Sequence, residues 1–335
     1  MNRTGESMTV VDQWCRSRNR LLLLVHERPD GDALGAQLGL HLILSAAGHE
    51  CVSFLSRPYP SRYEPLFGPT AKELDVFFGQ FPYAISDFDG VIVLDTSNAK
   101  RTDTPESIPV EQLRGTACVI DHHYDNERFG EVNWVDSDHA ATAQMIAEFA
   151  KSSGLTVSAA AATALLAGIM TDCGGFRFRN TTASVFRTAA NLADCGAVPG
   201  ILADALFFNE PYAKMRLKSK VLESAKFEFD GRFVYAVTTP ELLDELGLGP
   251  ADTEDVIDVI RAISGVEIAC LMQRTPDGDM RLSFRSRSET FDVSELAHEL
   301  GGGGHRLAAG ARLENTPVER AVSRVVELVG GVLES

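Results

Sequence analysis

The chain has 335 residues, of which 44% are hydrophobic and 23% charged, so it has the composition of a folded protein long enough for two domains. Its 31 Lys and Arg against 47 Asp and Glu give a formal net charge of −16. Such a charge argues against a general duplex-DNA or membrane-surface binder, because it repels long polyanions. The charge does not argue against a metal-dependent enzyme with an anionic substrate, since a bound divalent cation reverses the local electric field.

The cysteines and the hydrophobic pattern indicate the cellular compartment in which the protein works. The 6 cysteines are scattered and form no C-x-x-C pair, which predicts reduced thiols rather than disulfides or a zinc ribbon. The most apolar stretch, residues 159–170, is too short to span a bilayer. The polar N-terminus has no signal-peptide core. We therefore expect a cytoplasmic enzyme.

The first half of the chain alternates short apolar runs with helical segments. The run 21–25 is apolar throughout, as in a strand buried on both faces. A helix is predicted over 33–47. Similar apolar runs, separated by connections long enough for crossovers, occur at 51–55, 91–94 and 117–120. This pattern predicts an α/β fold with a parallel sheet.

The second half changes its pattern twice. Residues 140–206 are Ala-rich and helical in texture, and another helical stretch is predicted over 211–224. From about residue 226, pairs of apolar segments flank turns at 230–231 and 276–278, which predicts hairpins. We expect three parts, namely a catalytic domain at 1–195, a helical linker or hinge at 196–225 and a smaller α+β domain at 226–335.

Side chains that commonly bind metals follow three of the predicted strands. In chain order they are His26 with Asp30 and Asp32, then Asp95, then Asp121 with His122 and His123. In an open parallel sheet, ligands bind at the carboxyl ends of the strands. We therefore expect these side chains to share one crevice.

Each of these residues also has a structural interpretation. Asp32 fits a helix N-cap, Asp30 fits a turn and Asp95 fits a loop carboxylate. Taken together, purely structural roles would leave several carboxylates repelling one another in one crevice, a penalty that divalent cations remove. His and Asp ligands without Cys favour Mn, Fe, Co or Zn in a catalytic site. Two such ions about 3.5–4 Å apart can generate hydroxide and hold a phosphoryl group.

The order of these motifs resembles that of the DHH phosphoesterase superfamily. The motifs are His26-x-x-x-Asp30-Gly31-Asp32, Asp95, Asp121-His122-His123 and Asp172. The run Gly301-Gly302-Gly303-Gly304-His305 looks like the C-terminal DHH-associated domain, so the resemblance covers nearly the whole chain. At this length the combination is similar to the nanoRNase/pAp-phosphatase group, which includes bacterial enzymes that act on cyclic di-AMP breakdown products.

The resemblance implies roles for the individual residues. Two divalent metal ions would be bound, Mn before Mg or Co, the first by His26, Asp30 and Asp95 and the second by Asp32, Asp95, His122 and Asp172. His123 would be a catalytic residue that faces the substrate phosphate, and Asp121 would support the histidines. Cys173 stands where related sequences often carry Thr, and Gln144 where an acidic residue is common.

The second domain carries a candidate nucleotide site. Strand alternation places Arg281, Ser283, Arg285 and Arg287 on one face, which fits either a solvated basic face or substrate contacts. The run 301–304 fits either the end of a helix or a backbone that approaches a nucleotide closely. The resemblance favours substrate binding by Arg285, Arg287, Gly302, Gly303, Gly304 and His305.

We therefore expect a phosphoesterase that hydrolyses nanoRNA, pApA or cyclic di-AMP, and pAp to mononucleotides by a two-metal hydroxide mechanism. A short single-stranded substrate fits the acidic balance, because a long strand requires an extended basic groove. A homodimer is compatible with this interpretation, whereas long duplexes and membranes are not expected partners. The alternatives are a manganese-type inorganic pyrophosphatase, which the glycine run disfavours, a nucleotide-sensing module with an inactive metal site, and a RecJ-like long-strand exonuclease, for which the chain is too short.

Overall fold

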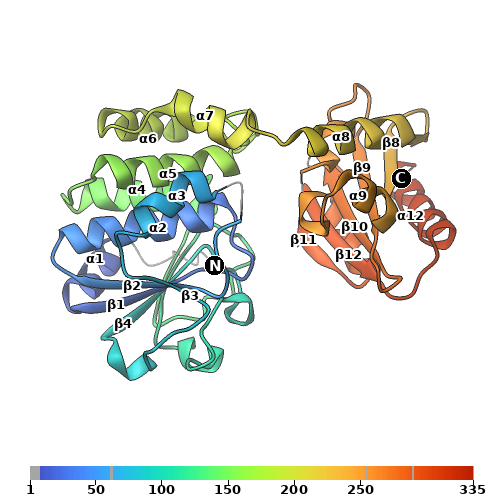
Figure 1. The fold of residues 1–335 in the computed structure, drawn as a ribbon. Coiled ribbons are helices and arrows are strands. Elements are labelled where there is room, and N and C mark those ends of the chain that lie inside the picture. Colours follow the sequence, from blue (N-terminus) through green and yellow to red (C-terminus); the bar gives the residue numbers. More distant parts are fainter. Residues whose placement is uncertain (1–7, 61–62, 254, 289, 335) are drawn as a thin grey trace. The chain divides into compact units, whose positions relative to one another are not determined.

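Figure 1 shows a computed structural model of the chain, which describes residues 8–60, 63–253, 255–288 and 290–334. The chain divides into two units, residues 1–209 and 210–335. We call them unit 1 and unit 2 and describe each by itself. Among the described residues, no helix has the length and apolar character needed to cross a membrane.

Unit 1 is built on a six-stranded sheet in which every neighbouring pair of strands is parallel. The strand order is β3-β2-β1-β4-β5-β6. The strands are β1 (Arg20–Leu24), β2 (Glu50–Leu55), β3 (Val76–Phe78), β4 (Gly90–Leu94), β5 (Cys118–Asp121) and β6 (Val132–Val135). The predicted parallel α/β sheet is confirmed, and the short strands β3 and β6 are additions to it.

The sheet of unit 1 is covered on both faces, which explains the unbroken apolar run of β1. Leu21 and Leu23 belong to a core with the helices, while Leu22 and Leu24 belong to a second core with aromatic and aliphatic side chains from the loops. The helices are α1 (Met8–Arg16), α2 (Gly31–Ala46), α3 (Glu64–Ala71), α4 (Thr142–Ser152), α5 (Ala159–Asp172), α6 (Ala183–Asp194) and α7 (Pro199–Phe207), with 3₁₀ turns at Ile85–Asp87, Ala99–Arg101 and Val110–Leu113. Figure 1 shows α6 and α7 outside α4 and α5.

Helices α2 and α5 approach each other backbone to backbone. A Cβ atom on Gly35 would collide with the carbonyl oxygen of Ala164 and lie 3.0 Å from the backbone nitrogen of Gly168. At the start of α2, Gly31 packs against the side chain of Thr171 near the end of α5, where a Cβ atom would also collide. The two helices are thus antiparallel neighbours, and this contact brings the first turn of α2 beside the last turn of α5.

The boundary between the units lies between Asn209 and Glu210, inside the segment 196–225 for which we expect a linker. Helix α7 packs onto unit 1 through Leu202. Helix α8 (Tyr212–Ser224) packs onto unit 2 through Leu217 and Val221. Most of the segment is therefore part of one unit or the other, and its role as a hinge stays a prediction.

Unit 2 is an α+β structure around a six-stranded mixed sheet of order β11-β12-β10-β9-β8-β7, in which only the β8–β9 pair is parallel among the described strands. The strands are β7 (Lys226–Glu228), β8 (Phe233–Thr238), β9 (Ile268–Arg274), β10 (Met280–Ser286), β11 (Gly303–His305) and β12 (Ala308–Leu313). The remaining helices are α9 (Pro240–Leu246), α10 (Ile257–Arg261), α11 (Val293–Glu299) and α12 (Val318–Leu333), with a 3₁₀ turn at Pro250–Thr253. Both predicted hairpins are confirmed, β7 with β8 and β9 with β10.

We expect Gly35→Ala to destabilise the protein, because the added methyl group meets backbone atoms of α5 that cannot swing aside. The free energy of unfolding should fall by about 1–3 kcal/mol, the usual cost of overpacking. Gly200→Ala in α7 is the matched control, since nothing lies within 4 Å of the added Cβ. Urea unfolding of both variants, followed by circular dichroism, measures the difference. Equal stability of the two variants would contradict the close approach of α2 and α5.

Candidate metal centre

The candidate site lies where the strand order of unit 1 reverses. The chain runs from β1 through β2 to β3 on one side, then returns to β4 on the other side of β1. Connections that leave neighbouring strands in opposite directions open a crevice at their carboxyl ends. His26 follows β1 and Asp95 follows β4, and their Nε2 and Oδ2 atoms lie 3.7 Å apart.

Two further carboxylates come from the start of α2. Asp30 is the N-cap residue, and its Oδ1 accepts hydrogen bonds from the backbone nitrogens of Asp32 at 3.0 Å and Ala33 at 3.1 Å. The N-cap that we expect at Asp32 is thus at Asp30, two residues earlier, because the helix begins at Gly31 and not at Ala33. The cap does not exclude a ligand role for Asp30, because the capping bonds occupy one oxygen. Asp32 is fully buried in the first turn.

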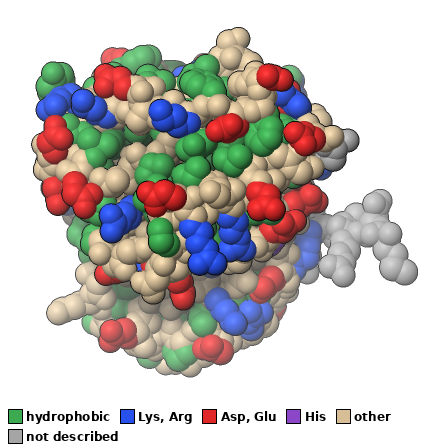
Figure 2. Space-filling view, turned by 90° about the vertical axis from the view of Figure 1, so that its right-hand side faces the viewer, with side chains coloured by type: hydrophobic (Ala, Val, Ile, Leu, Met, Phe, Trp, Pro, Cys, Tyr) green, Lys and Arg blue, Asp and Glu red, His purple; other side chains and the backbone are tan. Residues whose placement is uncertain are grey.

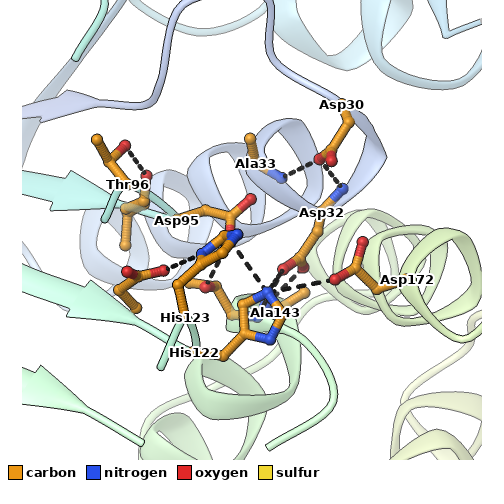
Figure 3. A network of polar contacts seen from close by, with 12 residues as sticks. Asp30, Asp32, Ala33, Asp95, Thr96, His122, His123, Ala143 and Asp172 are labelled. Carbon is orange, nitrogen blue, oxygen red and sulfur yellow. Dashed lines mark hydrogen bonds and ion pairs between the residues drawn. The ribbon is translucent and has the colours of Figure 1, made fainter. Parts of the chain in front are cut away.

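The antiparallel contact of α2 and α5 brings Asp172 beside Asp32. His122, the residue after β5, lies close to both carboxylates. The Nε2 atom of His122 lies 3.3 Å from Asp172 Oδ2 and 3.9 Å from Asp32 Oδ2. It also lies 3.5 Å from Asp95 Oδ1. Figure 3 shows the Asp32 and Asp172 carboxylates and the His122 ring turned toward one another.

The structure thus brings all six predicted metal-ligand residues of unit 1 together. Together with His123, they form three sets of possible ligand atoms, each with all atoms within 4.8 Å of one another. The sets are His26 with Asp30 and Asp95, Asp32 with His122 and Asp172, and Asp95 with His122 and His123. Asp95 and His122 each belong to two of the sets, so the three sets form one continuous cluster.

Hydrogen bonds to the other ring nitrogens orient the histidines. The Nδ1 atom of His26 lies 2.8 Å from the carbonyl oxygen of Glu27, so it donates there and leaves Nε2 for the crevice. His123 donates from Nδ1 to Asp121 Oδ1 at 2.7 Å. The other oxygen of Asp121 accepts from Asn126 Nδ2 at 2.6 Å. Asp121 therefore belongs to none of the ligand sets itself but orients His123, which belongs to one of them.

The start of α4 contacts two of the ligand carboxylates, a feature that our sequence analysis missed. The backbone nitrogens of Thr142 and Ala143 donate to Asp32 at 2.6 and 2.8 Å. The Thr142 hydroxyl donates to Asp95 Oδ1 at 3.1 Å. The one signal in the sequence is a Thr at the beginning of an Ala-rich helical stretch, which by itself indicates no contact with either aspartate.

Asp95 has an unusual backbone conformation. Its φ angle is 54°, in the left-handed region that L residues other than Asn and Asp rarely adopt. The backbone nitrogen of Asp95 still continues the sheet by donating to Ile120 at 3.0 Å. Such strain concentrates at functional sites, where the surrounding structure maintains it. Here it directs the side chain of a strand-end residue into the crevice.

The surroundings of Asp32, Asp95 and Asp172 disfavour the ionised form of these carboxylates. Burial raises the pKa of Asp32 well above its usual range, and three neighbouring carboxylates raise it further. The pKa of Asp172 is raised by burial and then by nearby aspartates. Burial and the Asp30 charge raise the pKa of Asp95, while the nearby histidines oppose them. A divalent cation would remove this penalty, and the set of carboxylate and imidazole donors fits one.

His123 and Asp121 behave as an ion pair instead. Burial raises the pKa of Asp121, but the hydrogen bonds from His123 and Asn126 and the nearby histidine charges together outweigh it, so the net change is downward. Burial lowers the pKa of His123, but its bond to Asp121 and the charge of Asp95 raise it to about 10. This pair therefore needs no cation to stay charged.

The predicted substrate-binding residues lie in unit 2. Arg285 on β10 is partly buried and donates to the carbonyl oxygen of Phe284 at 3.0 Å, and among the described residues no carboxylate pairs with it. Arg287 donates to the carbonyl oxygens of Val266 at 3.3 Å and Ile263 at 3.4 Å, so it holds a loop.

The glycine run has a structural role at three of its four positions. Gly301, with φ 77°, ends α11, as the helix-end interpretation predicts, and Gly304 has φ 140°. A Cβ atom on Gly302 would collide with β12. Only Gly303 among the four is free of both constraints, because its added Cβ would come no closer than 3.5 Å to a neighbour. The side chain of His305 lies outside the described residues.

Comparisons with known proteins agree with the motifs. Residues 20–169 match the DHH family, N-terminal domain, and residues 230–334 match the DHHA1 domain. The chain is 35% identical over 328 residues to the bifunctional oligoribonuclease and PAP phosphatase NrnA of Thermus thermophilus, an alignment that covers 98% of this chain and 94% of that protein. It is 26% identical over 332 residues to the cyclic-di-AMP phosphodiesterase GdpP of Geobacillus thermodenitrificans, covering 94% of this chain and 48% of that protein.

A solved structure shares the fold. The crystal structure of an exopolyphosphatase-related protein from Bacteroides fragilis matches with a TM-score of 0.85 at 22% identity, covering 100% of this chain and 98% of that one. At this identity the likeness concerns the fold alone. The two domain matches and the 35% identity to a relative aligned along nearly its whole length lead to one conclusion. The chain belongs to the DHH family, with a DHHA1 domain after its N-terminal DHH domain.

Proposed function

We propose that this chain is a divalent-metal-dependent phosphoester hydrolase that acts on very short oligoribonucleotides and small nucleotides. One observation carries the proposal, namely the six Asp and His ligand residues that converge at the strand-order reversal of unit 1. The relatives named as an oligoribonuclease and PAP phosphatase and as a cyclic-di-AMP phosphodiesterase support the substrate class. The candidate substrates are nanoRNA, pApA or cyclic di-AMP, and pAp.

The ligand sets suggest how two ions would be held. One would lie among His26, Asp30 and Asp95, and the other among Asp32, His122 and Asp172. Asp95 would bridge the two ions, because its Oδ2 lies 3.7 Å from His26 Nε2 and its Oδ1 lies 3.5 Å from His122 Nε2. Bound divalent ions would activate water for attack on phosphorus and neutralise the charge that develops there. We propose Mn for both positions, because imidazole and carboxylate ligands occur together.

The surrounding residues of the chain orient the reacting groups. Asp121 and Asn126 fix the ring of His123, which we propose as the residue that contacts the substrate phosphate. The start of α4 fixes the Asp32 carboxylate. In unit 2, Arg285 and Gly303 are the strongest candidates for nucleotide contact, the first because it has no carboxylate partner and the second because the fold does not require a glycine there.

A short substrate suits the charge of the protein. Figure 2 shows acidic and basic side chains interspersed over one face, without a continuous basic stripe on that face. The net charge of −16 adds a general repulsion of long strands. A cytoplasmic location and a homodimer stay predictions.

Asp95→Asn should abolish most of the activity while leaving the fold intact. The substitution keeps the size of the side chain and an acceptor for Thr142 but removes the shared negative charge. We expect Mn-dependent hydrolysis of pApA to fall by at least about 100-fold, since altering even an indirect ligand contact costs 10- to 100-fold. The unfolding temperature of the metal-free protein should stay the same or rise, because the crevice loses one buried charge.

Asp103→Asn is the matched control for this variant. Asp103 is also buried, and its Oδ2 accepts a hydrogen bond from the backbone nitrogen of Ser56, outside the ligand sets. This control should keep its Mn-dependent turnover. If Asp95→Asn also turned over pApA at close to the parental rate, the proposed bridging role would be wrong.

Gly303→Ala tests nucleotide contact in unit 2. If this backbone lies against the nucleotide, the methyl group should lower kcat/KM for pApA by roughly tenfold, equivalent to about 1.4 kcal/mol. Hydrolysis of bis(p-nitrophenyl) phosphate, which has no nucleoside, should fall much less. Gly331→Ala, with open space around the added Cβ, should change neither rate. Equal losses on both substrates would assign Gly303 a role in folding instead.

Substrate length should matter, and salt should weaken its effect. Dinucleotides should be hydrolysed faster per end than strands of ~20 nucleotides, whose additional phosphates meet an acidic protein. The preference should narrow at high salt, because screening weakens the repulsion. The measurement is kcat/KM against oligomer length at low and high salt. A profile that is flat or rises with length at low salt would favour a long-strand exonuclease.

A further inference from the structure

The first turn of α4 connects the ligand crevice to the rest of unit 1. Ala141 occupies the N-cap position of this helix and offers no side-chain acceptor to the free backbone N–H groups. The carboxylate of Asp32 takes that place, because it accepts from the first two N–H groups of the helix. The position of Asp32, and through Thr142 that of Asp95, therefore depends on where α4 begins.

Gln144 ties the beginning of α4 to the residues on either side of it. Its side chain is buried, and its Oε1 accepts from the backbone nitrogen of Ala140 at 3.0 Å. Its Nε2 donates to Glu148 Oε1 at 3.0 Å and to the Ser184 hydroxyl at 3.2 Å. The amide thus links the segment before α4, the next turn of α4 and helix α6.

Glu148 anchors this link from the other end. Its Oε1 accepts from the hydroxyls of Ser184 at 3.1 Å and Thr188 at 3.0 Å, both on α6, in addition to Gln144. Its Oε2 lies 3.2 Å from His139 Nε2, in the segment before α4. The hydrogen bonds from His139 and Gln144 lower the pKa of Glu148 to about 2 despite its burial. Glu148 is therefore an ionised acceptor on which four donors converge.

The pairing of residues 144 and 148 requires one donor and one acceptor. An ionised carboxylate only accepts, whereas an amide can do both. A Glu at position 144 would place a second carboxylate about 3 Å from Glu148, and the two would repel each other. Either residue can supply the acceptor in principle, provided that the other supplies the donor.

We propose that Gln144 and Glu148 are positioning residues that hold the start of α4, and with it the Asp32 and Asp95 carboxylates, in the arrangement that binds the divalent metal. Neither residue belongs to the ligand sets. The inference rests on the metal site of the proposed function and adds to it a structural element outside the crevice.

An exchange of the two residues provides the test. The variants are Gln144→Glu, Glu148→Gln and the double variant that carries both substitutions. Isothermal titration with Mn²⁺ alone measures metal binding directly, without substrate or turnover. Gln144→Glu should weaken Mn²⁺ binding by about 10- to 100-fold, the range found when a partner of a ligand is altered. The double variant, which restores one donor and one acceptor, should return to within about threefold of the parent.

A control separates positioning from general stability. Leu192 on α6 is buried in the core of unit 1, one turn after Thr188, and its apolar side chain makes none of the hydrogen bonds of the network. Leu192→Ala should lower the unfolding temperature through a cavity while leaving Mn²⁺ affinity within about threefold of the parent. Should Gln144→Glu fail to fold, Gln144→Met removes the same hydrogen bonds at similar volume and should weaken Mn²⁺ binding in the same direction.

Three results would overturn the inference. They are unchanged Mn²⁺ affinity in the folded Gln144 variants, a loss that the second substitution does not restore, and an equal loss in Leu192→Ala. Turnover of pApA and pAp is measured separately. A parent that binds Mn²⁺ and follows the expected pattern but hydrolyses neither nucleotide would contradict the proposed function and support the inference. A parent that binds no Mn²⁺ would contradict both.

Discussion

Four carboxylates, those of Asp30, Asp32, Asp95 and Asp172, share one crevice of unit 1. Within the described part of the chain, imidazoles and hydrogen-bond donors are the groups that balance their charge. Burial and mutual repulsion raise the pKa values of three of the carboxylates, so the metal-free protein carries an electrostatic cost at this point. Folding alone gives no reason for such an arrangement. A divalent cation accounts for it, because the same oxygens that repel one another become its ligands.

Several features of the fold hold these carboxylates close together in spite of their repulsion. The reversal of strand order next to β1 separates the loops and opens the crevice. The close contact of α2 and α5, which a side chain at Gly35 would prevent, sets Asp32 beside Asp172. The start of α4 then supplies N–H groups to Asp32 in place of a cap of its own. The geometry of the crevice thus depends on the ends of β1, β4 and β5 and on helices α2, α4 and α5, and not on one loop.

Much of this site could be predicted from the sequence because its ligands follow apolar runs that are long enough to identify as strands. His26 and Asp95 come directly after such runs, and His122 comes one residue after the run that ends at Ile120. The carboxyl ends of parallel strands then bring the three side chains to one edge of the sheet. The contacts of Thr142 could not be predicted, since a hydrogen bond to a residue 110 positions away leaves no local pattern. The left-handed backbone conformation of Asp95 could not be predicted from the sequence either, because tertiary context and not local sequence imposes it. The edge strands β3 and β6, of 3 and 4 residues, are too short to show a period.

We propose that the crevice of unit 1 binds divalent metal through the predicted residues. The most direct test is a crystal grown with Mn²⁺ and measured at the manganese absorption edge. The account predicts anomalous difference peaks among His26, Asp30 and Asp95 and among Asp32, His122 and Asp172. Well-ordered electron density for these side chains without any anomalous peak between them would contradict it.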